Sequence, residues 1–190
     1  MPAIQQIQEK NYALAPSMAR TGAAIIGGSL LIALLAQVSM RLPFTPVPVT
    51  LQTLGIYLVA AALGPRKGAL AVMAYLTEGF AGLPVFTPGN YGFAALLSPT
   101  GGYLLGFLPA VMISGYMLEK LPKSRLMAAA AFLCGAAALY ACGVLRLAGL
   151  LPSNILFAAG VLPFAVGEIF KITLAATLAK TAGKITRRLA

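Results

Sequence analysis

Long apolar stretches alternate along the chain with short breaks that are rich in proline, glycine or charged residues. A helix needs about 20 apolar residues to cross the hydrocarbon core of a bilayer, so stretches near this length predict membrane spans. Six of them follow one another, at residues 21–40, 50–63, 69–83, 101–118, 126–147 and 155–179. Several are shorter than a full crossing, which predicts tilted or broken helices. The pattern predicts an all-α integral membrane protein with about six transmembrane helices, folded as a single membrane domain over residues 1–190.

Polar segments flank and separate the predicted helices. Residues 1–20 form a polar arm before the first span, residues 21–179 the helix bundle, and residues 180–190 a basic tail. The break at 41–49 is rich in proline and cannot continue a helix. The linker at 84–100 is longer than most unstructured connections, yet it is uncharged and partly apolar. These features favour a lid that folds over a pocket.

Composition limits the classes of protein to consider. Hydrophobic residues make up 59% of the chain and charged residues 9%, whereas soluble domains carry about 25% charged residues. The net charge of +10 lies in short loops and the tail, which is a membrane-topology pattern and argues against nucleic acid as a partner. The chain contains no histidine and no aspartate, which excludes a histidine-ligated metal and a histidine-based triad. We therefore expect neither an enzyme nor a metal or cofactor site.

The basic residues fall almost entirely on one side of the predicted membrane. Eleven share the side of the N-terminus: Lys10, Arg20, Arg66, Lys67, Lys120, Lys123, Arg125, Lys180, Lys184, Arg187 and Arg188. Arg41 and Arg146 fall on the other side, and Lys171 lies inside the sixth span. Because cytoplasmic loops are enriched in lysine and arginine, both termini are predicted to be cytoplasmic. The 84–100 linker and the proline-rich break would then face outward.

Three charged residues are expected to bear part of the cost of placing a charge in the bilayer: Glu78, Glu168 and Lys171. A charge at the bilayer centre costs roughly 2.5–3.5 kcal/mol on insertion scales, so such residues are candidates for function. Glu168 and Lys171 are three positions apart, which places them on one helix face within reach of each other. They could form a structural ion pair, or bind a ligand that presents both donors and an acceptor. Glu78 lies near the outer end of its helix and could simply reach the interface, or take a ligand or coupling role.

Several ordered motifs resemble the BioY family, the biotin-binding membrane subunits (S components) of energy-coupling-factor (ECF) transporters. They are Pro46-Val-Pro-Val-Thr-Leu-Gln52, Leu63-Gly-Pro-Arg-Lys-Gly68, Gly82-Leu-Pro-Val-Phe86, Ser98-Pro-Thr-Gly-Gly-Tyr103 and Pro163-Phe-x-x-Gly-Glu-x-x-Lys171. The resemblance covers nearly the whole chain from about residue 30 onward. It implies six helices, a bacterial cytoplasmic (inner) membrane, cytoplasmic termini, and a pocket near the outer face. The loop between the third and fourth helices would close that pocket.

The resemblance also implies ligand contacts by position. Asn90 and Lys171 match polar family residues, although Asn90 beside Gly89 could merely make a turn. Glu168 matches a position that is usually aspartate, so the charge is kept and a methylene is added. Leu104 stands where some members carry arginine, which leaves the group that binds the biotin carboxylate unassigned. The candidate substrate-binding residues are Asn90, Glu168, Lys171, Tyr103, Phe86, Tyr91 and Gln52.

The chemistry of biotin suits these side chains. Biotin has a ureido ring with N–H donors and a carbonyl, an apolar sulfur ring and a carboxylate tail. Glu168 can accept from a ureido N–H, and Lys171 can meet the ureido carbonyl or the carboxylate. Asn90 can pair with either end, and aromatic side chains near the linker could cover the rings.

The predicted function is high-affinity biotin binding and uptake as the S component of an ECF transporter. The implied partners are biotin, membrane lipid, a transmembrane coupling protein and two cytoplasmic ATPase subunits, which would be separate because this chain has no P-loop motif. One alternative is an ion-coupled secondary carrier in which Glu78 or Glu168 carries a proton. Others are an S component for a different vitamin, and an intramembrane enzyme, for which no nucleophile–base constellation is evident.

Overall fold

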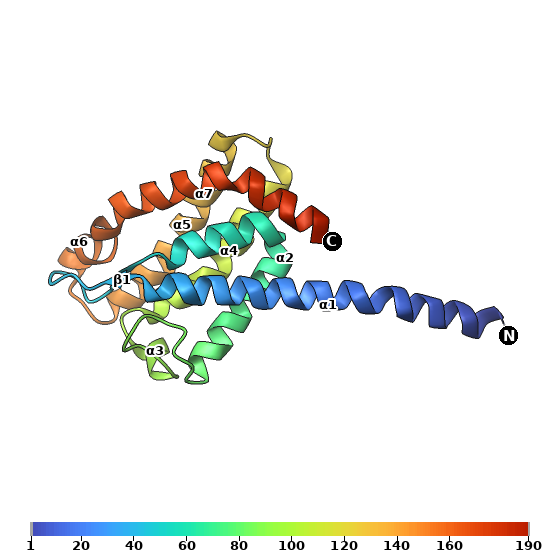
Figure 1. The fold of residues 1–190 in the computed structure, drawn as a ribbon. Helices are drawn as coiled ribbons and strands as arrows, with labels where there is room; N and C mark the ends of the chain where they lie inside the picture. The colour runs from blue at the N-terminus through green and yellow to red at the C-terminus, as the bar shows by residue number, and fades with distance from the viewer. Residues whose placement is uncertain (1, 190) are drawn as a thin grey trace.

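The apolar stretches form five long, membrane-spanning segments in the part of the chain that the computed structural model describes (Figure 1). The backbone is described for residues 2–189 and the side chains for residues 18–179 and 181. In chain order the elements are α1 (Pro2–Gln37), β1 (Ser39–Met40), β2 (Val49–Thr50), α2 (Gln52–Phe80), α3 (Ala94–Leu97), α4 (Gly101–Lys120), α5 (Arg125–Ala148), the 3-10 helix η1 (Ser153–Ile155), α6 (Leu156–Gly160) and α7 (Leu162–Leu189). The predicted all-α membrane fold is confirmed.

The predicted polar arm and first span belong to one helix. α1 runs without a break from Pro2 to Gln37. The side chains of the arm before Met18, and those of the predicted basic tail other than Thr181, lie outside the described residues. Farther along α1, large apolar side chains such as Ile26, Leu30 and Leu34 are exposed, as expected for a helix that faces lipid.

A kink divides α2 into two arms. Gly64 has φ 71° and ψ −172°, a conformation that favours glycine, and Pro65 follows it without an N–H to donate. The predicted turn at 64–68 is therefore a break at a single residue, after which the helix resumes. Figure 1 shows the two arms running in different directions, so the five membrane-spanning segments of the described residues comprise six arms, in agreement with the apolar pattern.

The break at 41–49 forms the loop of a short antiparallel hairpin. Ser39 pairs with Thr50 and Met40 with Val49. The predicted lid, the 84–100 linker, carries one helical turn, α3, and is held to the bundle by Phe86. The ring of Phe86 is 1% exposed and lies 5.2 Å from the ring of Tyr75 on α2. Figure 1 shows the hairpin, α3 and α6 toward one end of the bundle and both termini toward the other.

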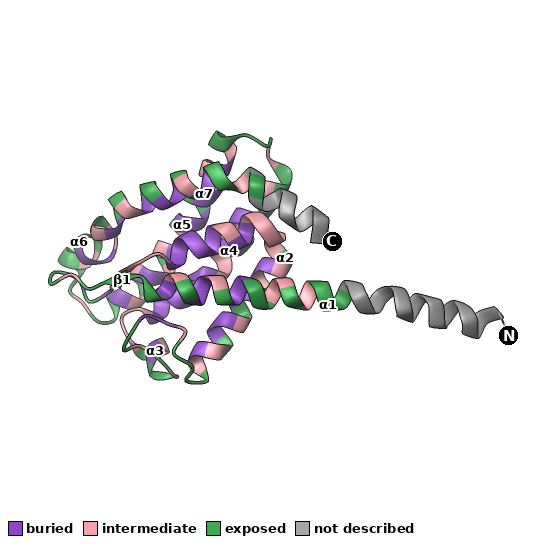
Figure 2. Ribbon diagram, in the orientation of Figure 1, coloured by how far each residue is buried: buried purple, intermediate pink, exposed green. Residues whose placement is uncertain are grey.

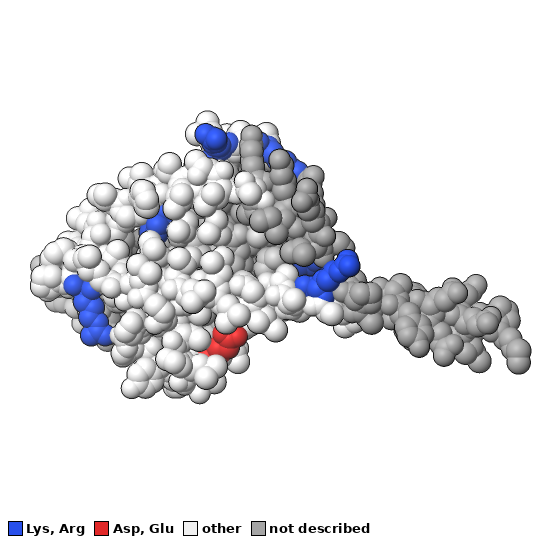
Figure 3. Space-filling view, in the orientation of Figure 1, with Lys and Arg blue, Asp and Glu red and all other residues white. Residues whose placement is uncertain are grey.

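Side chains that face inward are buried, whereas those on the outer faces of the helices are exposed (Figure 2). The first arm of α2 packs Tyr57 against Phe132 of α5, and the second arm packs Tyr75 near Phe107 of α4. The exposed side chains are largely apolar, and Figure 3 shows few charged atoms on the visible face of the bundle. A surface of this kind is stable in lipid rather than in water, so the protein is a multi-pass membrane protein.

Candidate ligand-binding site

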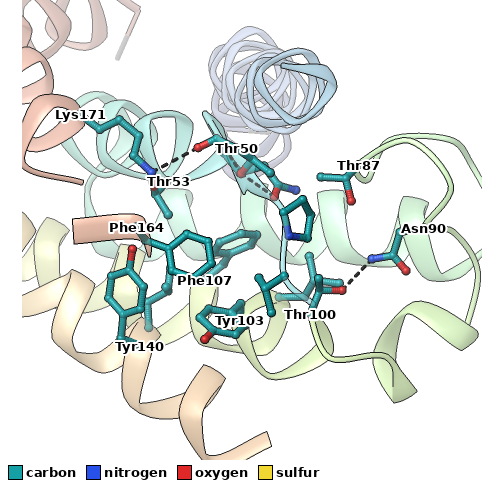
Figure 4. Close-up of a pocket in the computed structure, with 15 residues that line it drawn as sticks. Thr50, Thr53, Thr87, Asn90, Thr100, Tyr103, Phe107, Tyr140, Phe164 and Lys171 are labelled. Carbon is teal, nitrogen blue, oxygen red and sulfur yellow. Dashed lines mark hydrogen bonds between the residues drawn. The ribbon is translucent and has the colours of Figure 1, made fainter. Parts of the chain in front are cut away.

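A pocket opens where the hairpin and the 84–100 linker meet α2, α4, α5 and α7 (Figure 4). We call it the main pocket. Its free volume is about 50 Å³. Its lining residues are Val47, Pro48, Thr50, Gln52, Thr53, Thr87, Asn90, Thr100, Tyr103, Leu104, Phe107, Leu139, Tyr140, Phe164 and Lys171. All of them are uncharged except Lys171.

Lys171 and Glu168 form a buried ion pair at one end of the main pocket. Their charged atoms are 2.7 Å apart, and the two residues are 4% and 5% exposed. Both lie on α7, which begins at Leu162 with Pro163 in its first turn, a position that tolerates proline. Lys171 Nζ also donates to the backbone carbonyl of Thr50, 3.2 Å away, which ties α7 to the hairpin. The ion pair predicted from the three-residue spacing is therefore present.

Glu168 lies behind Lys171 rather than on the pocket wall, and other helices supply its remaining partners. Thr53 Oγ1 donates to Oε2 at 3.2 Å and Tyr140 Oη donates to the same oxygen at 3.0 Å. Tyr57 Oη donates to Oε1. No buried side-chain nitrogen or oxygen atom in the described part of the chain lacks a hydrogen-bond partner. A ligand group that bonds to Glu168 must therefore replace one of these bonds or use the lone pair left on Oε1.

Gln52 begins α2 and takes part in a second polar chain on the pocket wall. Its Nε2 donates to Tyr75 Oη at 2.6 Å, and its Oε1 accepts from Thr50 Oγ1 at 3.0 Å. These bonds fix the side chain of Gln52 across the pocket wall. Gln52 and Lys171, predicted from separate motifs, are thus brought together through Thr50.

Asn90 reaches the pocket from the 84–100 linker. Its Nδ2 donates to Thr100 Oγ1 at 2.7 Å, and its backbone N–H donates to the carbonyl of Thr87 at 2.9 Å. Asn90 therefore makes the turn that was its alternative role, with Gly89 at φ 81°, and also lines the pocket. Figure 4 shows its amide directed toward Thr100.

Aromatic rings form one wall of the main pocket. The rings of Tyr103, Tyr140 and Phe164 lie 6.1 Å apart in each pairwise combination. Tyr103 Oη donates to the backbone carbonyl of Gly160 at 2.7 Å, which fixes its ring. This wall offers aromatic surface close to the polar groups of Lys171, the combination that ligand pockets use for affinity and orientation.

Besides Glu168, two of the predicted residues, Phe86 and Tyr91, do not line the pocket. Phe86 is buried beneath the linker, where it holds the linker to α2. Tyr91 is 61% exposed on the outside of the linker, and Phe93 beside it is exposed as well. Their aromatic character suggested ring contacts, but the linker turns the side chains of Tyr91 and Phe93 away from the pocket.

Sequence reasoning did not single out several lining residues. They are Thr50, Thr53, Thr100, Phe107, Tyr140 and Phe164. Thr50, Thr100 and Phe164 belong to the quoted motifs, so the motifs carried a signal. The signal for Tyr140 was weaker, namely a hydroxyl within the apolar run 126–147.

A second cavity, which we call the loop pocket, adjoins the main pocket. Its volume is about 320 Å³, and Arg41 is its one charged lining residue among those described. Pro48, Thr87, Asn90 and Thr100 line both cavities. The two cavities therefore adjoin each other at side chains from the hairpin and the linker.

Glu78 lies apart from both pockets. Its Oε2 accepts from Ser29 Oγ of α1 at 2.7 Å, so it links α1 to the second arm of α2. The described residues hold no group of three or more histidine, cysteine, aspartate or glutamate side chains that could bind a metal.

The chain is similar to known proteins over most of its length. The sequence model of the BioY family matches residues 8–188. The biotin transporter BioY of Rhodobacter capsulatus is 36% identical over 171 residues, covering 80% of this chain and 90% of that protein. A probable biotin transporter BioY of Pyrococcus horikoshii is 37% identical over 145 residues, covering 76% and 85%. The crystal structure of the S-component for biotin from an ECF-type ABC transporter matches with a TM-score of 0.78 and 29% identity, covering 86% of this chain and 90% of that chain.

Proposed function

Because the chain belongs to the BioY family, we propose that it is the biotin-binding membrane subunit of an ECF transporter and mediates biotin uptake. The observation that carries this proposal is the main pocket, where an aromatic wall lies beside the buried, hydrogen-bonded Glu168–Lys171 pair. A ureido ring presents N–H donors and a carbonyl acceptor side by side. Glu168 and Lys171 offer the complementary acceptor and donor.

In the proposed complex the fused rings of biotin lie against the aromatic wall of Tyr103, Tyr140 and Phe164. The ureido group takes over bonds that Glu168 and Lys171 make to Tyr140 and Thr50. Asn90 bonds to the ligand from the linker. The main pocket, at about 50 Å³, is small for a bicyclic ligand, since pockets for small molecules usually have volumes of roughly 300–1,000 Å³. The linker must therefore move outward to admit biotin, in keeping with a lid.

The proposed partners are a transmembrane coupling protein and two cytoplasmic ATPase subunits. This arrangement places the chain in the bacterial cytoplasmic membrane with both termini in the cytoplasm. The excess of lysine and arginine on the side of the termini supports this orientation, since positive loops stay inside. In this role the subunit captures ligand and carries out no chemical conversion.

Titration of the purified protein with biotin tests the proposal. We expect saturable binding at or below micromolar ligand, and competition by unlabelled biotin but not by riboflavin or thiamine. Absence of saturable binding would contradict biotin as the ligand, and displacement by another vitamin would assign a different one. Measurement of biotin uptake in cells separates the ECF role from an ion-coupled carrier. In the ECF role, deletion of the ATPase subunits abolishes uptake although the proton gradient is intact.

Substitution of the ion pair tests the site. Glu168→Ala and Lys171→Ala should each weaken biotin binding by at least tenfold, because each removes a charge-assisted hydrogen bond worth roughly 1.5–3 kcal/mol. Glu78→Gln is a matched control, since Glu78 bonds to Ser29 away from the pocket. If both alanine variants bind biotin as tightly as the unaltered protein, the ligand does not occupy this end of the pocket.

A further inference from the structure

The two adjoining cavities contain two charged lining side chains among the described residues. Lys171 lines the main pocket and Arg41 lines the loop pocket. Lys171 is paired with Glu168 at 2.7 Å, so that end of the main pocket is electrically neutral and carries an acidic group. Arg41 takes no part in the one ion pair found among the described residues. Its positive charge is therefore uncompensated within the described structure.

These charges determine where a ligand with a carboxylate at one end can place that carboxylate. Near Glu168 the carboxylate would meet a like charge in a buried setting, where repulsion is screened little. Every other side chain of the main pocket is neutral, and Leu104, deep in the wall, is apolar and 3% exposed. The remaining place where a carboxylate gains a positive partner is the loop pocket, beside Arg41.

The hairpin holds Arg41 next to the wall that the two cavities share. Met40 pairs with Val49, so continuing this register by one residue sets Arg41 opposite Pro48. Pro48 lines both the main pocket and the loop pocket. The guanidinium of Arg41 donates to the backbone carbonyl of Pro88 at 2.8 Å, which directs it toward the linker. Arginine has five N–H donors, so enough remain to bind a carboxylate through two parallel bonds.

Arg146 provides a contrast on the same end of the bundle. Its guanidinium donates to the backbone carbonyls of Leu97 and Ser98, and it lines neither cavity. It therefore ties α5 to the end of α3 and is not directed at a ligand. Of the two arginines that the sequence places on this side, the one with access to a cavity is Arg41.

We propose that Arg41 binds the carboxylate of the ligand, and that the ligand spans both cavities with its ring system beside Lys171 and its tail in the loop pocket. This inference rests on the proposed function, because biotin is the ligand that fits both ends. Arg41 is then the residue that selects for a free acid. It also joins the hairpin to the linker through the ligand, since Pro88 and the carboxylate share one guanidinium.

The test compares biotin with biotin amide, which keeps the ring system and chain but has no charge. The unaltered protein should bind biotin roughly 10–100-fold more tightly than the amide, the range expected for hydrogen bonds to a charged group. Arg41→Gln should bind both ligands with the weaker affinity, whereas Arg41→Lys should keep part of the preference. Arg146→Gln should keep all of it.

Three outcomes overturn the inference. One is an Arg41→Gln variant that retains the full preference for biotin over the amide. This result would contradict the role of Arg41 but would not contradict biotin as the ligand. Another is an Arg41→Gln variant whose affinities for biotin and for the amide fall by the same factor, because a merely structural contact to Pro88 does not distinguish a carboxylate from an amide. The third is absence of saturable biotin binding by the unaltered protein, which overturns the proposed function as well.

Discussion

Glu168 accepts hydrogen bonds from four side chains that come from three helices. Thr53 and Tyr57 lie on α2, Tyr140 on α5 and Lys171 on α7. An ionised carboxylate in a buried setting is costly unless it is paired and hydrogen-bonded, and this cage meets both conditions. Glu168 therefore links three helices through hydrogen bonds, and it is also a candidate ligand contact.

Lys171→Met should lower the stability of the protein by about 3–5 kcal/mol, because it leaves the buried carboxylate of Glu168 without a counter-charge. Thermal unfolding in detergent measures the loss. The double variant Glu168→Gln, Lys171→Met should recover part of it, since neither charge then remains unpaired. A double variant that is no more stable than Lys171→Met would show that the loss comes from packing and not from charge.

The spacing of Glu168 and Lys171 was sufficient to predict their ion pair, because residues three apart on a helix share a face. The partners Thr53, Tyr57 and Tyr140 could not be predicted in the same way. They lie up to 115 positions away along the chain, so their approach depends on how α2 and α5 pack against α7. Periodicity describes single helices and carries no information on which helices meet.

At the scale of elements, glycines allow α4 and α5 to approach closely. A Cβ atom on Gly102 would overlap the carbonyl oxygen of Cys142, and one on Gly106 would lie 2.9 Å from that of Leu139. Small residues at such contacts let helix backbones pack together in a membrane. This close contact positions Tyr103 and Tyr140, on α4 and α5, at the aromatic wall.

Gly135→Ala should destabilise the α4–α5 contact by about 1–3 kcal/mol, the range for overpacking a tight interface. Its Cβ would overlap Ser114 Oγ and would lie 2.8 Å from the carbonyl oxygen of Ala110. Gly27→Ala on α1 is the matched control, because its Cβ would have no described atom within 4 Å apart from its chain neighbours and the backbone of its own helix. Melting temperatures of the two variants in the same detergent provide the comparison, and equal values would contradict close packing at Gly135.

Helix positions were largely predictable from the apolar stretches, and α4 and α5 begin and end within two residues of the predicted bounds. The kink in α2 was predicted as a turn, because Gly64 and Pro65 both interrupt helices. Proline in the first turn of a helix loses no bond, however, so the second arm can begin at once. The structured turn of the linker, α3, has four residues and is too short to leave a periodic signal.

At the scale of the molecule, the hairpin, the linker and α6 lie at the end of the bundle away from the termini (Figure 1). Both cavities are lined by residues of this end, including Arg41 and Asn90. From the one-sided distribution of lysine and arginine we predict that the cavities open away from the cytoplasm.

Single cysteines should report this orientation after Cys134 and Cys142 are replaced by alanine. Ser153→Cys, exposed in η1, should react with a membrane-impermeant maleimide in intact cells. Lys123→Cys, exposed in the turn between α4 and α5, should react only after the cells are permeabilised. The reverse pattern would contradict cytoplasmic termini.

The pairing of Glu168 with Lys171 also bears on the permeability of the membrane to ions. A lone carboxylate at the end of a membrane cavity would attract protons and sodium ions, whose gradients store energy for the cell. The four hydrogen bonds to Glu168, one of them from a lysine, leave no net charge there for a small cation to neutralise. We therefore expect this end of the pocket to bind neither protons nor sodium ions in place of Lys171.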